Sequence, residues 1–239
     1  MKVDGREVWA RNADRRLAPG SLTKMMTALL VLERSGLGEV VTVSEAASRE
    51  TGTRLGLSPG DRLPVVDLLA ATLLGSANDA CHALADHVDG SEKEFVSRMN
   101  ARAQAMGLAE TRFANACGHD APGMRSTARD LARLAEAAME NPVFARMVGI
   151  VRGEIATEDG GRKFLLENKN ELVGRYRGAV GVKTGFTSRA GKCLVAYAER
   201  DGGRVLLVLL NAPDRWWKAE EMLDAAFSRR GGNPESRAP

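Results

Sequence analysis

The spacing of apolar residues changes late in the chain. Up to about residue 150, apolar positions recur every three or four residues, which is the pattern of helices with one buried face. From about Ala179, short runs typical of β-strands are separated by turn residues such as Asp201-Gly202-Gly203, which predicts antiparallel strands. The predicted strands are Ala179–Gly185, Lys192–Ala198 and Arg204–Leu210, and a helix from about Asp214 to Phe227 follows them.

The N-terminal segment is expected to contribute a further strand and then a buried helix. Asp4-Gly5 indicates a turn before a short strand that ends at Glu7–Ala10, and Pro19-Gly20 breaks the chain. Ser21 opens a helix that extends to about Arg34. Because this helix is apolar nearly all round, it is predicted to be buried on every side.

Capping residues mark the starts of the helices in the middle of the chain. Two apolar helical stretches between Leu63 and Val88 are interrupted at Gly75-Ser76-Ala77-Asn78. Polar residues that can accept backbone N–H groups precede each later apolar run. The predicted caps are Asn78 or Asp79, Ser91 with Glu94, and Thr127 with Asp130.

The order of elements predicts an α+β fold, with an antiparallel sheet flanked by helices and an inserted, mostly helical lobe. We expect one catalytic domain over residues 1–227, in which residues 1–20 and 179–227 form the sheet part. The helical lobe covers about residues 37–150. Residues 228–239 are rich in Arg, Gly and Pro, and are predicted to be a disordered tail.

Composition excludes several classes of function. The formal net charge is +3 and the basic residues are scattered among acids, which argues against a nucleic-acid partner. Neither the three cysteines nor the three histidines have metal-ligand spacing, so we expect buried free thiols, no metal and no cofactor. The sequence shows no apolar run long enough to span a bilayer, no signal peptide and no membrane anchor.

Three short motifs carry candidate chemistry. They are Ser21-Leu22-Thr23-Lys24, Ser76-Ala77-Asn78 and Lys183-Thr184-Gly185. Each motif alone is weak, because a serine and a lysine three residues apart occur by chance in many helices. All three in this order, with each in the expected kind of element, form the signature of penicillin-binding proteins and class A β-lactamases.

The first motif pairs a nucleophile with a base. The Ser21 hydroxyl is a poor nucleophile until a neighbouring group takes its proton. Lys24 lies one turn further on the same side of the helix and can reach that hydroxyl, provided that its amine is uncharged. Burial and a second cation, Lys183, would both favour the uncharged amine. The backbone N–H of Ser21, at a helix N-terminus, can donate to a developing oxyanion.

The second motif lies in an extended break, so the two polar side chains can face the same site. Ser76 can relay a proton between Lys24 and the leaving amine, and Asn78 can hold the amide of a substrate. A simple loop with an Asn helix cap is the alternative for this motif.

The third motif ends a strand. Lys183 and Thr184 can bind a C-terminal carboxylate, and Gly185 allows the backbone of a substrate to approach the strand edge. The N–H of Phe186 is then expected to be the second oxyanion donor.

The sequence resembles the D-alanyl-D-alanine carboxypeptidase family of low-molecular-weight penicillin-binding proteins, which share the β-lactamase-like fold. The resemblance extends from about Glu7 to Phe227. It rests on the motifs and on further segments, among them Ala18–Thr27, Gly75–Ala80, Phe95–Asn100, Thr111–Asn115, Ser126–Asp130 and Gly181–Thr187 with Ala190–Cys193.

The resemblance implies a serine D,D-carboxypeptidase that removes the terminal D-alanine from peptidoglycan stem peptides and is acylated by β-lactams. It implies Ser21 as nucleophile, Lys24 as base, Ser76 and Asn78 as the second motif, and Lys183 with Thr184 at the substrate carboxylate. It also implies export to the periplasm or cell envelope.

Three alternatives remain open at this point. A β-lactamase on the same scaffold would need a carboxylate that activates water for deacylation, and Glu167 and Glu171 are followed by the wrong residues for that motif. An esterase or a D,D-endopeptidase would use the same three motifs. A catalytically inactive peptidoglycan-binding protein is the third alternative, which the intact motifs disfavour.

Overall fold

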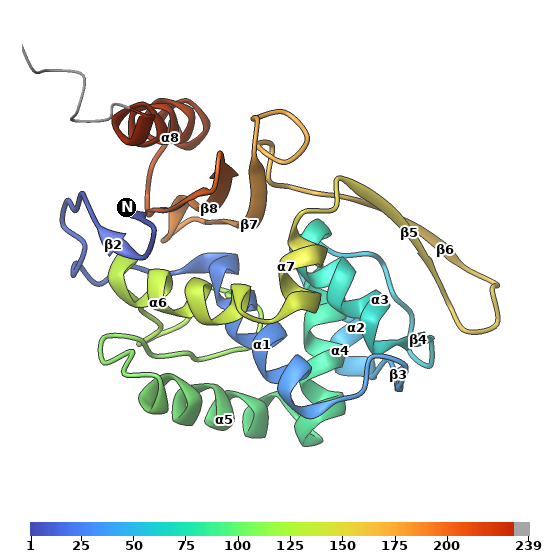
Figure 1. Ribbon diagram of the computed structural model, residues 1–239. Coiled ribbons are helices and arrows are strands. Elements are labelled where there is room, and N and C mark those ends of the chain that lie inside the picture. Colours follow the sequence, from blue (N-terminus) through green and yellow to red (C-terminus); the bar gives the residue numbers. More distant parts are fainter. Residues whose placement is uncertain (232–239) are drawn as a thin grey trace, which may run out of the picture.

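A five-stranded antiparallel sheet organises the chain (Figure 1). The computed structural model describes residues 1–231. The strand order is β2-β1-β9-β8-β7, so the N-terminal hairpin forms one edge and β7 the other. The strands are β1 (Lys2–Val3), β2 (Arg6–Glu7), β7 (Ala179–Thr187), β8 (Gly191–Arg200) and β9 (Gly203–Leu209). This sheet confirms the three strands predicted late in the sequence.

Helices are the main regular structure between the N-terminal hairpin and β7. A 3₁₀ turn, η1, and a π-helical turn, η2, each precede a helix of the candidate site. The elements are η1 (Gly20–Thr23), α1 (Lys24–Arg34), α2 (Glu45–Ser48), α3 (Val65–Ala70), η2 (Ala71–Gly75), α4 (Asn78–Asp89), α5 (Glu92–Ala105), α6 (Ala128–Met139), α7 (Pro142–Val148) and α8 (Arg215–Gly231).

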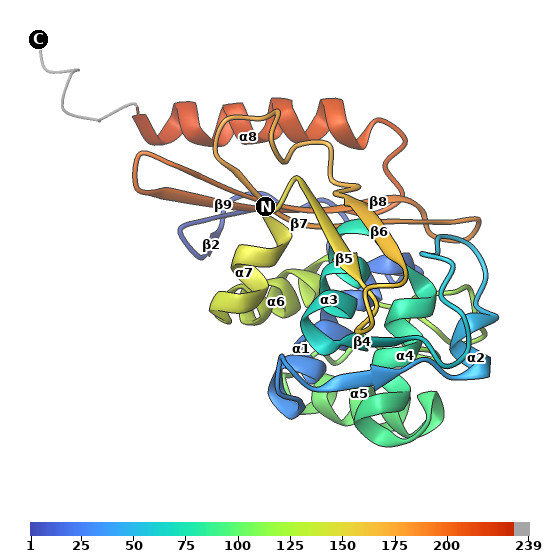
Figure 2. The same ribbon diagram turned by 90° about the vertical axis from the view of Figure 1, so that its right-hand side faces the viewer.

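Helices cover both faces of the sheet (Figure 2). On one face, α8 packs against β8 and β9 around a small core that includes Leu207 and Leu223. On the other face lies the helical lobe, whose larger core contains α1 near its centre. Every residue of α1 from Lys24 to Val31 is buried. The predicted α+β fold and the predicted burial of the Ser21 helix are therefore confirmed.

Two two-stranded sheets were not predicted from the sequence. One pairs β3 (Val40–Thr42) with β4 (Arg62–Pro64), and the other pairs β5 (Arg152–Ala156) with β6 (Lys163–Glu167). The strands of the first sheet are three residues long and are separated by helix α2 and its flanking loops, so no periodicity marks them. The second has a turn signal at Asp159-Gly160 that could have identified it.

Both ends of the chain differ from the predictions. The Asp4-Gly5 turn is present, with both residues at positive φ, but β2 ends at Glu7 and residues 8–10 lie outside any strand. The last helix continues to Gly231, so residues 228–231 are helical and the predicted tail does not begin at residue 228. The rest of that predicted tail lies outside the described residues.

Two of the three predicted helix caps are confirmed. The hydroxyls of Ser91 and Thr127 accept the backbone N–H groups of Glu94 and Asp130. The cap predicted for α4 is wrong, because its N-cap is Ala77, which has no side-chain acceptor.

The acidic residue near the start of α4 has a different task. Asp79 is fully buried and accepts the backbone N–H groups of Leu55, Gly56 and Leu57, which fixes the preceding loop against the helix.

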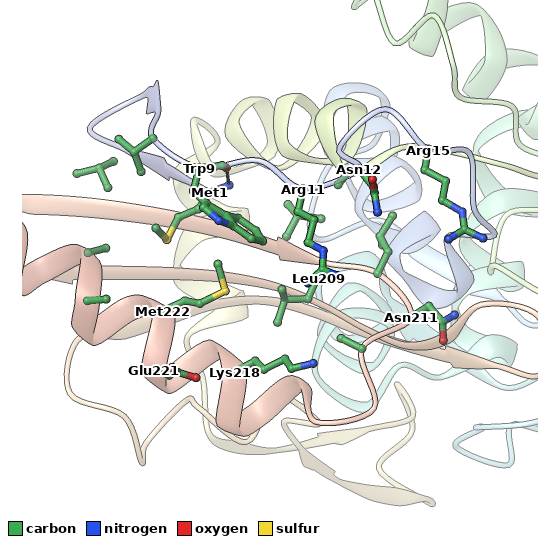
Figure 3. A pocket seen from close by; sticks show the side chains of 18 of the residues that line it. Met1, Trp9, Arg11, Asn12, Arg15, Leu209, Asn211, Lys218, Glu221 and Met222 are labelled. Carbon is green, nitrogen blue, oxygen red and sulfur yellow. Dashed lines mark hydrogen bonds between the residues drawn. The ribbon is translucent and has the colours of Figure 1, made fainter.

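A pocket of about 940 Å³ lies between the N-terminal hairpin, β9 and α8 (Figure 3). β1 pairs with β9 only at Lys2–Leu206 and Val3–Val205. Leu209, at the end of β9, lies beyond this pairing and lines the pocket. None of the motif residues lines it. Within residues 1–231, no helix is long and apolar enough to cross a membrane.

Candidate active site

The first motif forms a contact at the junction of η1 and α1. Ser21 lies in the 3₁₀ turn and Lys24 is the first residue of α1. The Nζ atom of Lys24 lies 3.3 Å from the Oγ atom of Ser21. Lys24 is fully buried, whereas Ser21 is partly exposed. The predicted placement of the Ser21 and Lys24 side chains on the same side of the helix is therefore confirmed.

Two oxygen atoms orient the amine of Lys24. Its Nζ atom donates to Asn78 Oδ1 at 2.6 Å and to the carbonyl oxygen of Cys117 at 2.5 Å. Asn78 Nδ2 donates to the carbonyl oxygen of Thr51, which identifies the amide atom facing Lys24 as the acceptor oxygen. An uncharged amine has two N–H groups, and both are used by these acceptors. Its lone pair is then left for the proton of the Ser21 hydroxyl.

The loop that carries Cys117 was not predicted to belong to the site. It approaches the turn that holds Ser21 so closely that a Cβ atom on Gly118 would lie 2.1 Å from the carbonyl oxygen of Gly20. Asn115 Oδ1 accepts the backbone N–H groups of Gly118 and His119 and so fixes the loop. The role of Cys117 belongs to its backbone, which a side-chain motif does not reveal.

The second motif is more tightly turned than the extended break that we expected. Ser76 has φ 61° and ψ 28°, in the left-handed region, because it ends the π-helical turn η2. Only Ala77 is extended, and Asn78 is already the first residue of α4. Asn78 contacts Lys24, while its expected contact with a substrate amide, like the proton relay by Ser76, stays a prediction.

The third motif lies within β7, at the edge of the sheet. Lys183 and Thr184 are 1% and 6% exposed, and Lys183 Nζ donates to the carbonyl oxygen of Thr184 at 3.2 Å. Burial, followed by repulsion from Lys24, lowers the pKa of Lys183 well below its ordinary value. A substrate carboxylate beside Lys183 would favour its charged form.

The glycine of the third motif also packs closely against the Ser21 turn. A Cβ atom on Gly185 would lie 3.2 Å from the carbonyl oxygen of Pro19 and 3.2 Å from the backbone nitrogen of Ser21. Glycine is therefore needed so that β7 can pack against η1. Its expected contact with a substrate backbone stays a prediction.

The backbone nitrogen of Phe186 also lies near the Ser21 turn. It would be 3.6 Å from a Cβ atom on Gly20, while the ring of Phe186 is 65% exposed. This placement supports the expected pairing of the Ser21 and Phe186 N–H groups as oxyanion donors, which stays a prediction.

One further cation supports β7 and was missed by the sequence analysis. Arg215, the first residue of α8, donates to the carbonyl oxygens of Gly185 and Cys193, at 2.9 and 3.2 Å. Its charge also contributes to the lowered pKa of Lys183. No local motif marks this arginine, because it follows the third motif by thirty residues and only the fold brings them together.

The cysteines are structural, as predicted. Cys81, Cys117 and Cys193 are all buried free thiols. Burial raises the pKa of the Cys117 thiol well above its ordinary value, which keeps it in the unreactive protonated form.

Lys183→Met is expected to stabilise the fold while it removes activity. The folded pKa of Lys183 lies below the ordinary value of 10.5, so the unfolded chain binds the proton more tightly. The residue therefore destabilises the wild type at neutral pH, and this cost declines as the pH rises toward 10.5. Methionine removes the cost, so urea unfolding at pH 7 should show a gain of about 1–3 kcal/mol.

The pH dependence separates this prediction from a general change in packing. The stability difference between Lys183→Met and the wild type should shrink between about pH 7 and pH 10. Lys192→Met, at an exposed position on the neighbouring strand β8, is the control and should change nothing. A Lys183→Met variant that is less stable than the wild type at pH 7 would contradict the prediction.

Comparison with known proteins identifies the class of enzyme and then the family. The crystal structure of the Streptomyces K15 DD-transpeptidase matches with a TM-score of 0.87 and 33% identity, covering 94% of this chain and 93% of that one. The structure of a D-alanyl-D-alanine carboxypeptidase from Mycobacterium tuberculosis H37Rv matches with a TM-score of 0.88 and 33% identity, covering 97% and 90%. The fold and the contact between Ser21 and the buried Lys24 are thus those of the β-lactamase-like class of serine enzymes.

Sequence comparison places the chain more narrowly. The family model for D-alanyl-D-alanine carboxypeptidase matches residues 3–214. The chain belongs to this family. D-alanyl-D-alanine carboxypeptidase DacF of Bacillus subtilis (strain 168) is 35% identical over 238 residues, which is 96% of this chain and 61% of the relative. The chain therefore spans about three fifths of the length of that relative.

Proposed function

We propose that the chain is a serine D,D-carboxypeptidase that removes the terminal D-alanine from peptidoglycan stem peptides through an acyl-enzyme on Ser21. One observation carries the proposal: the buried amine of Lys24 has two acceptors for its hydrogens and faces the Ser21 hydroxyl. The family of the chain and its structural neighbours support the same chemistry.

The reaction has an acylation and a deacylation half. Lys24 takes the proton of Ser21 while Oγ attacks the carbonyl carbon of the penultimate residue. The N–H groups of Ser21 and Phe186 hold the oxyanion, and Lys183 with Thr184 holds the substrate carboxylate. Ser76 passes the proton to the leaving D-alanine. Water then cleaves the ester, which releases the shortened peptide and restores Ser21.

A β-lactam would acylate the same serine and would be released slowly. The two carboxylates that the sequence singled out as candidates for water activation are exposed, and they pair with arginines elsewhere: Glu167 with Arg152, and Glu171 with Arg175. We therefore propose β-lactams as covalent inhibitors rather than substrates. The family also supports an extracytoplasmic site of action at the cell wall.

The activity is tested by comparing three substrates with one preparation of the protein. We expect free D-alanine to be released from a peptide ending in D-Ala-D-Ala faster than cross-linked muropeptides are cleaved. We also expect nitrocefin to be hydrolysed for about one turnover only. Preferential cleavage of the cross-links would indicate an endopeptidase, and sustained nitrocefin hydrolysis would indicate a β-lactamase. Either result would overturn the proposal.

A further inference from the structure

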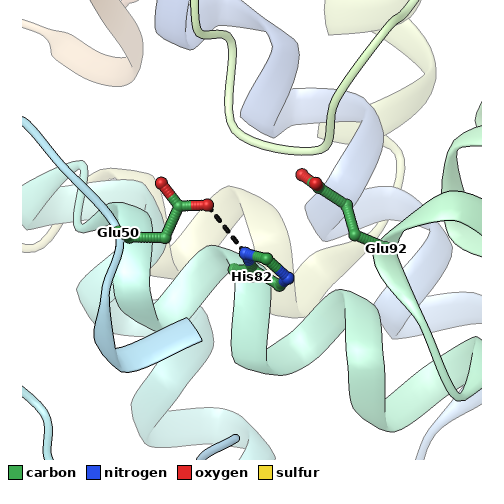
Figure 4. A group of neighbouring side chains, drawn as sticks. All are labelled: Glu50, His82 and Glu92. Atoms are coloured by element: carbon green, nitrogen blue, oxygen red, sulfur yellow. Dashed lines mark hydrogen bonds and ion pairs between the residues drawn. The ribbon is translucent and has the colours of Figure 1, made fainter. Parts of the chain in front are cut away.

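Glu50 contacts two histidines, His82 and His119, in a partly buried cluster, and Figure 4 shows its contact with His82. Its Oε1 atom contacts Nδ1 of His82 at 2.7 Å, and its Oε2 atom contacts Nε2 of His119 at 2.7 Å. The Glu50 side chain is 13% exposed. The sequence separations are 32 and 69 residues, so the carboxylate connects segments that only the fold brings together.

The cluster is a closed hydrogen-bonded network. His82, Glu50 and Glu92 lie close enough together to hold a cation. However, both oxygens of Glu50 face histidines, and Glu92 Oε1 already accepts the backbone N–H of Ala116 at 2.9 Å. Nε2 of His82 also lies 3.5 Å from Asp86. Both oxygens of Glu50 and both ring nitrogens of His82 thus have partners within the protein, which explains their arrangement without a metal.

The contacts of Glu50 with His82 and His119, which we call the Glu50 bridge, are strengthened by charge. Burial alone would raise the pKa of Glu50, but the hydrogen bonds from His119 and His82 outweigh it and lower that pKa to about 2. Burial alone would lower the pKa of His82, but the hydrogen bonds to Asp86 and Glu50 raise it to about 10. At neutral pH the Glu50–His82 contact is therefore an ion pair with little access to water, where such contacts are stronger than at the surface.

Each segment that Glu50 joins also holds a residue of the candidate active site. The residue after Glu50, Thr51, supplies the carbonyl oxygen that accepts Asn78 Nδ2 at 2.6 Å. His82 lies one helical turn after Asn78 on α4. His119 lies two residues after Cys117, whose carbonyl oxygen accepts from Lys24. The bridge thus joins helix α4 and the loop of Cys117, which supply the two acceptors of the Lys24 amine, to the loop of Thr51, which holds Asn78.

We propose that Glu50 is a positioning residue for acylation of Ser21. By holding the loop of Thr51, helix α4 and the loop of Cys117 together, it keeps both acceptors of Lys24 in place. It touches neither Ser21 nor Lys24 itself. The inference rests on the proposed function, because it concerns the geometry of the amine that we propose as the base.

Glu50→Gln tests this inference with little change of shape. A neutral amide has one acceptor oxygen and cannot accept from both histidines. We expect the rate constant for acylation by a fluorescent penicillin to fall about 10- to 100-fold, since small displacements of catalytic groups have effects of this size. Glu45→Gln, an exposed carboxylate on α2 that pairs with Arg49, is the matched control and should acylate at the wild-type rate.

A double-mutant cycle separates positioning from a general loss of stability. Because Asn78→Ala removes one of the two acceptors that Glu50 holds in place, adding Glu50→Gln to it should lower the acylation rate by a smaller factor than Glu50→Gln lowers the wild-type rate. If the two losses simply multiply, Glu50 does not act through Asn78 and the inference is overturned. Should Glu50→Gln not fold, His119→Ala, which removes one of the two contacts at a residue 33% exposed, is expected to lower the rate several-fold.

The outcomes distinguish this inference from the proposed function. A wild type that no penicillin acylates would overturn both. A wild type that is acylated, with Glu50→Gln or the folded His119→Ala variant acylated equally fast, would overturn the positioning role and leave the proposed function intact.

Discussion

Ser21→Ala is expected to abolish acylation by β-lactams and the release of D-alanine, while the variant unfolds at the same urea concentration as the wild type. The hydroxyl of Ser21 has Lys24 as its hydrogen-bond partner and lies at a partly exposed position, so its removal leaves no cavity in the core. The loss of rate should reach at least about 10⁴-fold, because no covalent intermediate can form.

Lys24→Met is expected to lower the acylation rate by about 10²–10⁴-fold, the usual contribution of a general base. Unlike Ser21→Ala, it should also destabilise the fold, because Asn78 Oδ1 and the carbonyl oxygen of Cys117 lose their buried donor. We expect a cost of about 2–5 kcal/mol in urea unfolding. Full acylation of Lys24→Met would mean that another group takes the proton of Ser21.

Gly118→Ala is expected to have the largest effect on the structure of the site without a change in any motif residue. The added Cβ atom would lie 2.1 Å from the carbonyl oxygen of Gly20 and 2.9 Å from the backbone nitrogen of Ser21. Both neighbours are backbone atoms, so the loop or the Ser21 turn must move. We expect a loss of about 2–4 kcal/mol in stability, together with slow acylation.

Gly123→Ala separates this clash from the cost of the backbone conformation. Both glycines have positive φ, 92° for Gly118 and 76° for Gly123, which alanine adopts at a cost of about 1–2 kcal/mol. At Gly123 the nearest atom to the added Cβ is 3.9 Å away, at the end of the Arg112 side chain. If both variants lose the same stability and acylate equally fast, the close approach of the Cys117 loop to the Ser21 turn does not matter for acylation.

The parts of the fold that were predictable are those encoded by short-range patterns. The burial of α1 follows from apolar residues on all its sides, and β7, β8 and β9 follow from short strand-like runs between turns. The side chains of Ser21 and Lys24 were predictable as a pair because one helical turn separates them. This prediction depends only on the fixed spacing of residues within one helical segment, and not on the remainder of the chain.

The remainder of the site depends on contacts between distant segments. The carbonyl oxygens of Cys117 and Thr51 accept hydrogen bonds from Lys24 and Asn78. Every residue has a backbone carbonyl, so the residue type does not reveal this role. Asp79 looked like a helix cap, but it instead holds the loop of residues 55–57, since that loop packs against the start of α4. The Glu50 bridge was likewise invisible, because its partners lie on separate segments.

The most direct test of the central claim is mass spectrometry of the protein after incubation with benzylpenicillin. We predict that the intact mass increases by the mass of one penicillin molecule, and that peptide mapping places the adduct on Ser21. The Ser21→Ala variant should remain unmodified under the same conditions. An unmodified wild type, or an adduct on any other residue, would contradict the assignment of Ser21 and Lys24 as nucleophile and base.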